Sequence, residues 1–155
     1  MPIKKVKEFL DERGVKYTTA KHPEAYTAQE IAASAHIPGK ELGKTVIVQL
    51  DGRKAMAVLP ASYQLDHQKL ADLAEAKSVE IVSENEFKEL FPECETGAMP
   101  PFGNLYDLEV YVAEPLPDDD EVSFNAGSHT ELIRLSYADF ERLVKPVVGD
   151  FARKE

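Results

Sequence analysis

The stretch KTVIVQLDGRKAMAVLP, residues 44 to 60, decides how the fold is built. Two apolar runs rich in β-branched residues flank the dipeptide Asp51-Gly52, and such runs are typical of strands. Asp-Gly fits a tight type I′ turn, because both central residues of that turn take a positive φ. The stretch therefore predicts an antiparallel β-hairpin.

Helices and further strands are expected on both sides of this hairpin. Capping boxes begin at Thr27 and at Ser83, where Ser or Thr is followed three residues later by Glu. The expected helices cover residues 3–13, a segment from 27, 66–76, 83–90 and 136–145; the expected strands cover residues 17–22, 79–82, 105–113, 121–127 and 130–136.

Hairpins interleaved with helices predict an α+β fold with a mixed sheet, and not alternating βαβ units. The chain has 155 residues, of which 43% are hydrophobic and 30% charged. This length and composition fit one compact domain over residues 1–155, large enough to bury a core without disulfides. We find no internal repeat, low-complexity tract or linker.

Composition excludes several classes of protein. No apolar run approaches the roughly 20 residues of a membrane span, and the charged first residues are unlike a signal peptide, so we expect a cytoplasmic protein that contacts no membrane. The single cysteine, Cys94, lies between two glutamates that disfavour a reactive thiolate. A net charge of −10 argues against a protein that coats DNA or RNA. Residues 1–44 are nevertheless slightly basic, with eight Lys and Arg against six Asp and Glu.

The common catalytic signatures, GxSxG, HExxH and the glycine-rich phosphate loops, are missing. The four histidines, at 22, 36, 67 and 129, lie far apart in the sequence, so a zinc site would need carboxylates brought in by the fold. The acidic run 118–121 is more typical of a solvated turn than of a metal site. We therefore expect no metal and no cofactor.

Three segments remain as candidates for function. TGAMPPFGN, residues 96–104, combines glycines with two prolines and would present a rigid backbone edge, or serve only as a turn. Lys44 begins the strongest strand, where it could hold a phosphate or simply be solvated. FNAGSHTELI, residues 124–133, places a small-residue turn and His129 between two strands, and a surface histidine is the simpler interpretation there.

Together, in this order and spacing, these segments resemble the YbaK/ProX family, the free-standing relatives of the editing domain inserted in bacterial prolyl-tRNA synthetases. The resemblance is carried by the lysine-led strand from Lys44, by the GxxxP loop Gly97-Ala-Met-Pro-Pro101 with Phe102-Gly103, and by the turn Phe124-Asn-Ala-Gly127. It covers nearly the whole chain. It implies a curved mixed sheet, or partial barrel, flanked by helices.

The resemblance also implies an activity: metal-free, substrate-assisted deacylation in trans of mischarged aminoacyl-tRNA, with a small amino acid on tRNAPro. By position, Lys44 would engage the terminal adenosine or its phosphate, while Gly97 and Pro101 would hold the aminoacyl ester as catalytic residues. The expected partners are the tRNA acceptor end and an aminoacyl-tRNA synthetase. The residues expected to bind the substrate are Ala98, Met99, Pro100, Phe102, Gly127, Ser128 and His129.

Two alternatives stay open from the sequence. The first is a non-catalytic module of the same fold that binds an aminoacyl or nucleotide group or docks on a synthetase. The second is a metal-dependent hydrolase using His22, His36 or His129, which chelators would inhibit. The presence of both the lysine and the loop favours an enzyme.

Overall fold

The computed structural model describes residues 4–21, 42–82, 99–114, 116–118, 120–126 and 130–154. Several expected features lie outside these residues: the helices from Thr27 and Ser83, Cys94, and His22 with His36.

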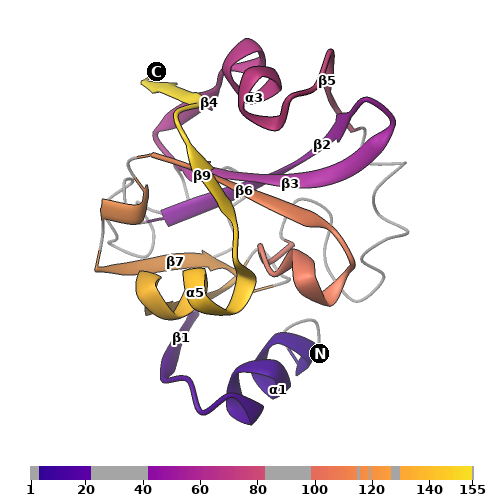
Figure 1. Ribbon diagram of the computed structural model, residues 1–155. Coiled ribbons are helices and arrows are strands. Elements are labelled where there is room, and N and C mark those ends of the chain that lie inside the picture. The colour runs from indigo at the N-terminus through magenta and orange to yellow at the C-terminus, as the bar shows by residue number, and fades with distance from the viewer. Residues whose placement is uncertain are drawn as a thin grey trace.

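One mixed sheet organises the described chain, in the strand order β1-β8-β7-β2-β3-β6-β9, with β5 paired to β2 (Figure 1). Antiparallel pairing joins β1 to β8, β8 to β7, and β2 to both β3 and β5. Parallel pairing joins β7 to β2, β3 to β6 and β6 to β9. The α+β expectation is confirmed, and the sheet is not a closed barrel. The strands are β1 (Tyr17–Lys21), β2 (Leu42–Leu50), β3 (Arg53–Pro60), β5 (Val79–Ile81), β6 (Glu109–Ala113), β7 (Glu121–Asn125), β8 (Glu131–Ser136) and β9 (Val147–Gly149).

The central hairpin forms where the sequence predicts it. β2 and β3 pair from Leu50 opposite Arg53 onward, and the two turn residues, Asp51 and Gly52, have φ values of 50° and 93°. The Asp51 carboxylate also accepts hydrogen bonds from the backbone N–H groups of Lys77 (2.9 Å) and Ser78 (2.9 Å). These bonds tie the hairpin turn to the segment that leads into β5.

Helices cover the two faces of the sheet, because alternate residues of each strand point to opposite sides. α1 (Lys4–Glu12) and α5 (Tyr137–Val144) contribute to one core cluster, together with strand residues such as Ile47. α3 (His67–Ala74) contributes to the other, together with strand residues such as Val48. We call these sides the α5 face and the α3 face. Figure 1 shows α3 and α5 far apart, with strands between them.

Aromatic rings fill the core of the α5 face. Phe140 of α5 lies 4.9 Å from the Phe124 ring of β7 and 5.6 Å from the Phe102 ring, centroid to centroid. All three side chains are fully buried. α5 begins as the sequence predicts: Ser136 Oγ accepts from the Asp139 N–H at 3.1 Å, and the helix ends with Lys145 at φ 54°, just before Pro146. Two short 3₁₀ helices, η3 (Gly103–Leu105) and η4 (Leu116–Asp118), flank β6.

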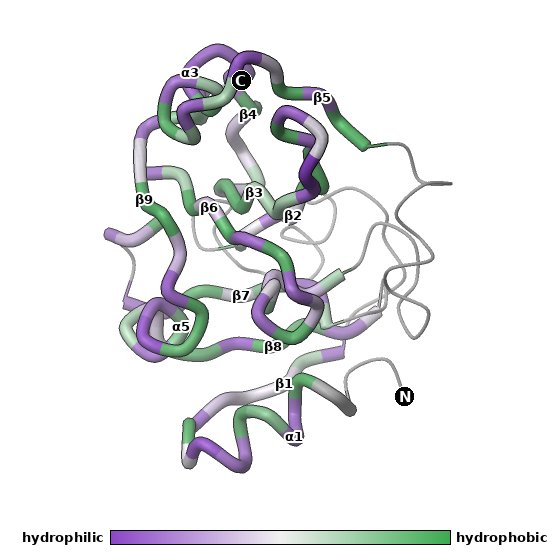
Figure 2. The backbone as a smooth tube through the Cα atoms, turned by 45° about the vertical axis from the view of Figure 1, so that its right-hand side comes forward, coloured by the Kyte–Doolittle hydropathy of each residue, from purple (hydrophilic) through white to green (hydrophobic). Residues whose placement is uncertain are grey.

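Short strands near the C-terminus were not predicted. β9 adds to the sheet beside β6, and β10 (Ala152–Lys154) pairs with β4 (Tyr63–Leu65) in a separate two-stranded sheet. Three residues are too few to show a clear pattern of apolar and polar side chains, whereas the tube in Figure 2 changes between hydrophilic and hydrophobic colours along α1 and α5. The pairing of these short strands depends on partners that are distant in the sequence.

Candidate active site

Lys44 occupies the third position of β2, an interior strand between β7 and β3. Its side chain is half-buried, and its ammonium donates to the backbone C=O of Ala61 at 3.4 Å. The Ala61 N–H donates to the C=O of Leu42 at 2.8 Å, which fastens the turn after β3 to the start of β2. The ammonium is therefore held at the start of an interior strand, and is not simply a solvated surface group.

The strand register places polar residues beside Lys44. β2 and β7 are parallel, with Leu42 opposite Ser123 and Gly43 opposite Phe124, so the next step of the register sets Lys44 beside Asn125. β8 places Arg134 opposite Ser123. Neighbouring strands lie about 4.8 Å apart, and side chains in register point to the same side. Lys44, Ser123, Asn125 and Arg134, which we call the Lys44 patch, therefore share the α3 face.

A buried hydrogen bond orders part of this patch. Ser123 is fully buried, and its Oγ accepts from Arg134 Nη1 at 2.9 Å. The Arg134 guanidinium also lies 3.8 Å from the Glu121 carboxylate, measured from Nε to Oε2. Arg134 is half-buried, with 29% of its side chain exposed. The patch thus contains two cations, Lys44 and Arg134, on strands that β7 separates.

Asn125 differs from its neighbours. Its side-chain oxygen, Oδ1, is buried and has no hydrogen-bond partner, alone among the buried side-chain polar atoms of the described residues. A buried amide oxygen loses its bonds to water, so it normally acquires a protein partner. Because none of the described residues supplies a donor to it, this acceptor is available to another group.

The described part of the GxxxP loop is buried. Met99, Pro100, Pro101 and Phe102 all have little exposed surface, and Met99 and Phe102 belong to the core of the α5 face. Gly103 holds the end of the loop, because its C=O accepts from the N–H groups of Tyr106 and Leu108, each at 2.9 Å. Two backbone hydrogen bonds therefore hold the end of the loop, and its rigidity stays a prediction from the prolines.

The structure brings together only some of the expected site residues. Lys44 lies on the α3 face, whereas the side chains of Met99 and Phe102 pack on the α5 face, so these side chains do not share a surface. The substrate-binding roles assigned to Met99, Pro100 and Phe102 stay predictions, and the Phe102 ring packs in the core. The expected site residues Gly97, Ala98, Gly127, Ser128 and His129 lie outside the described residues.

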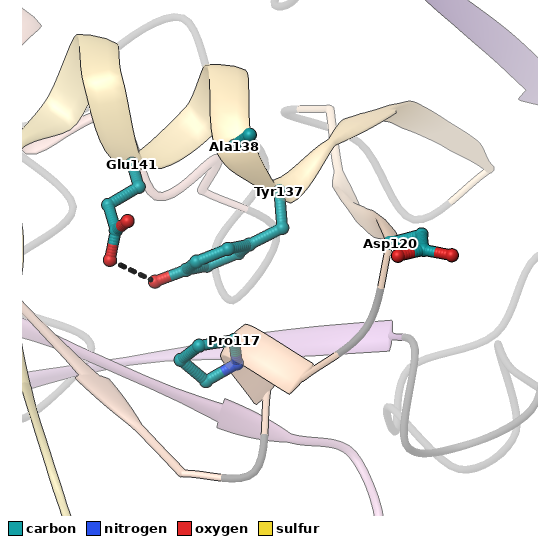
Figure 3. A pocket seen from close by; sticks show the side chains of 5 residues that line it. All are labelled: Pro117, Asp120, Tyr137, Ala138 and Glu141. Carbon is teal, nitrogen blue, oxygen red and sulfur yellow. Dashed lines mark hydrogen bonds between the residues drawn. The ribbon is translucent and has the colours of Figure 1, made fainter.

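A separate open cavity of about 290 Å³ lies beside the N-terminus of α5 (Figure 3). It is lined by Pro117, Asp120, Tyr137, Ala138 and Glu141. The Tyr137 hydroxyl donates to Glu141 Oε1 at 3.3 Å, and burial followed by the nearby Glu141 charge raises the pKa of the phenol above its usual value. Tyr137 packs in the core of the α5 face, so this cavity does not include the Lys44 patch.

Among the residues that the structure describes, no three His, Cys, Asp or Glu side chains gather in a way that could hold a metal ion. No helix in this part of the chain is both long enough and apolar enough to cross a membrane. Three of the four histidines fall outside these residues, so the metal-hydrolase alternative needs a biochemical test.

Residues 22–143 match the model of the aminoacyl-tRNA editing domain. The chain belongs to this family. The matched segment includes the strand of Lys44, the GxxxP loop and the turn after Asn125. The expected resemblance is confirmed.

Individual relatives of this editing-domain chain agree. It is 29% identical to the Escherichia coli K12 multifunctional Ser/Thr-tRNA deacylase ProXp-y, over 94% of this chain and 89% of the relative. It is 25% identical to a Bacillus mycoides proline–tRNA ligase, over 57% of this chain and 15% of the ligase. A solved protein proposed to be a trans-editing enzyme for prolyl-tRNA synthetase superposes with a TM-score of 0.83 at 23% identity, over 99% of this chain and 97% of its own. The crystal structure of the hypothetical protein APE2540 superposes with a TM-score of 0.87 at 24% identity, over 97% of this chain and 100% of that protein.

The family assignment supports a trans-editing aminoacyl-tRNA deacylase and does not favour the non-catalytic module. Ser123, Asn125 and Arg134 were not among the expected site residues, although Asn125 lies in the candidate segment 124–133. The alternation of apolar and polar residues in EVSFN, residues 121–125, could have indicated two of them. It places Ser123 and Asn125 on the side of the strand opposite Val122 and Phe124. Their closeness to Lys44 depends on the β2–β7 pairing, which is parallel and distant in the sequence.

Proposed function

We propose that this editing domain hydrolyses the ester of a mischarged tRNA at a site formed by the Lys44 patch and the loop that ends at Pro101. The observation that carries the proposal is Lys44 itself: a half-buried ammonium at the start of an interior strand, held at 3.4 Å by the Ala61 carbonyl, within a matched editing domain. A cation in this position suits the phosphate or ribose of a terminal nucleotide.

Ester hydrolysis can proceed here without a protein nucleophile. An aminoacyl ester is already activated, so a site can accelerate its hydrolysis by orienting a water and by stabilising the charge that develops on the carbonyl oxygen. The water adds to the carbonyl carbon, the ester C–O bond breaks, and the ribose oxygen leaves with a proton. Lys44 would hold the nucleotide end, and the backbone of residues 97–101 would hold the carbonyl group.

The substrate is proposed to be a small amino acid on tRNAPro. The relationship to a proline–tRNA ligase supports the tRNA, and the relationship to a Ser/Thr-tRNA deacylase adds seryl and threonyl esters to the candidates. One methylene is worth only about 1–3 kcal/mol in an apolar pocket, so a small pocket would accept several small side chains.

The charge of the chain limits how the tRNA can bind. With a net charge of −10, the protein as a whole repels a polyanion, so we propose that it contacts only the acceptor end. Lys44 and Arg134 are cations on the proposed contact surface. This mode of binding fits an enzyme that acts in the cytoplasm on released tRNA or beside a synthetase.

The test is deacylation of a panel of mischarged tRNAs by the full chain, with EDTA present. The panel contains Ala-, Cys-, Ser- and Thr-tRNAPro. Hydrolysis of at least one species, with no effect of EDTA, is the expected result. No hydrolysis of any species would favour the non-catalytic binding module, and loss of activity in EDTA would favour the metal-dependent hydrolase.

A further inference from the structure

The unpartnered oxygen of Asn125 is the observation in the described residues that the fold leaves unexplained. Oδ1 is buried, and it accepts no hydrogen bond. Removing an acceptor from water without giving it a donor costs free energy, so the native state retains this arrangement at the expense of stability. Groups of this kind in native proteins are often explained by function.

Comparison with Ser123 shows that the free-energy cost of an unpartnered acceptor is specific to Asn125. Both residues lie on β7, two positions apart, and both point to the α3 face. Ser123 Oγ is fully buried and accepts from Arg134 at 2.9 Å, so the described residues supply a donor to one acceptor and none to the other. Ser123 is therefore a matched internal reference for Asn125.

The neighbour in the strand register suggests what kind of ligand would use the acceptor. The β2–β7 register, continued by one residue beyond Gly43 and Phe124, sets Lys44 of β2 beside Asn125. An ammonium only donates hydrogen bonds, whereas an amide oxygen only accepts them. A ligand that meets both groups must offer an acceptor or an anion to Lys44 and a donor to Asn125. An aminoacylated terminal nucleotide has this combination, with phosphate and carbonyl oxygens as acceptors and the α-ammonium and the free ribose hydroxyl as donors.

We propose that Asn125 Oδ1 accepts a hydrogen bond from the aminoacylated ribose of the substrate. The inference rests on the proposed function and assigns to its site a residue that recognises the reacting end. A ligand without the donor would leave the buried oxygen unpartnered, and sites that bury a polar group discriminate strongly against such ligands. Asn125 would therefore contribute to specificity as well as to binding.

Asn125→Leu tests this role, because it replaces the amide by an apolar group of similar size. The probe is adenosine with a seryl group attached through a 3′-amide, which cannot be deacylated, and its binding to the full chain is measured by calorimetry. We expect the variant to bind the probe about tenfold more weakly than the wild type. Its melting temperature should equal or exceed that of the wild type, because a buried oxygen without a partner has been removed.

Ser123→Ala is the matched control, and it should show a lower melting temperature. If Asn125 has only a structural role, the Asn125→Leu variant should instead have a lower melting temperature than the wild type and bind the probe normally. That result would overturn the inference. If leucine prevents folding, Asn125→Ala removes the same oxygen without added bulk, and its binding to the probe decides in the same way.

Two modified probes identify the donor. One lacks the ribose 2′-hydroxyl and the other carries an acetylated α-amine. One of these changes should weaken binding to the wild type about tenfold and have little effect on Asn125→Leu, because the bond is already absent there. If a probe modification weakens binding equally in the wild type and in Asn125→Leu, the inference is overturned while the proposed function stands. Failure of the wild type to bind any probe, together with no deacylation, would overturn the proposed function and this inference with it.

Discussion

Gly43 packs its backbone directly against the ring of Phe124. A Cβ added to Gly43 would lie 2.5 Å from Phe124 Cε1 and 3.2 Å from a methyl of Val58. Gly43 immediately precedes Lys44, and Phe124 immediately precedes Asn125. The strand register that pairs Gly43 with Phe124 therefore also sets the two polar residues side by side on the opposite face.

Gly43→Ala should destabilise the protein by about 1–3 kcal/mol, because the added methyl cannot be accommodated without moving a fully buried ring. Urea unfolding measures the change. Gly149→Ala is a suitable control, because the added Cβ there would meet the end of the partly buried Leu73 side chain, which can move more easily. An equal or larger loss in the control would show that the Phe124 contact is not unusually restrictive.

Lys44→Ala should lower the rate of deacylation at least tenfold, which corresponds to about 1.4 kcal/mol of transition-state stabilisation. Its thermal stability should change little, because the side chain is only half-buried and contributes little to the core. Lys69→Ala removes the same charge from an exposed position on α3, where the lysine pairs with Asp150, and should leave the rate unchanged. Normal turnover of Lys44→Ala would refute the role of this lysine.

Ser123→Ala should destabilise the protein by about 1–3 kcal/mol, because it removes the acceptor that Arg134 Nη1 uses at 2.9 Å within a buried setting. Chemical unfolding measures the loss. Asn125→Leu, by contrast, is expected to leave the stability unchanged or to raise it. If both substitutions shift the stability in the same direction, the distinction between a partnered and an unpartnered oxygen is wrong.

The local parts of the fold were predictable from local signals. Asp51-Gly52 identified the central hairpin, and Ser136 with Asp139 identified the start of α5, since each signal acts within a few residues. The order of strands was not predictable in detail. β7 pairs with β2 and β9 pairs with β6, and both contacts join parallel segments separated by many residues.

The same distinction applies to the candidate site. Lys44 and the loop from Gly97 to Pro101 were identified by their resemblance to a family. Asn125 was placed both in the expected strand 121–127 and in the turn Phe124-Asn-Ala-Gly127. It is the last residue of β7, and the β2–β7 register sets it beside Lys44. Its unpartnered oxygen is a property of three-dimensional burial, so no sequence pattern could have revealed it.

Acid should weaken the contact between the hairpin turn and the segment before β5. Backbone hydrogen bonds from Lys77 and then Ser78 lower the pKa of the Asp51 carboxyl below its usual value. A lowered folded-state pKa gives stability that is present above the unfolded pKa of about 4 and is lost as the pH falls through the folded-state pKa.

Asp51→Asn should therefore reduce the dependence of the melting temperature on pH between about 5 and 2. The variant keeps an oxygen acceptor for the Lys77 and Ser78 N–H groups, but it has no charge to titrate. Melting curves of the wild type and the variant across this range make the comparison. Identical pH profiles would mean that Asp51 does not contribute to the acid sensitivity.

Gly103→Ala tests whether the GxxxP loop is more than a turn. A Cβ at Gly103 would lie 2.6 Å from the backbone oxygen of Leu108 and 2.6 Å from Val110 Cγ2. Neither atom can move easily, because the Leu108 N–H also donates to the Gly103 oxygen at 2.9 Å and Val110 is in the core. The strain should displace the adjoining loop and destabilise the protein by about 1–3 kcal/mol.

The kinetic result separates the two interpretations of the loop. If the loop holds the ester carbonyl, Gly103→Ala should lower kcat at least tenfold while KM changes little, because the Lys44 patch still binds the nucleotide. Val144→Ala, a core change at the end of α5, is expected to cause a comparable loss of stability and serves as the control for general destabilisation. Equal kcat values for the two variants would show that residues 97–101 support the fold and do not position the substrate.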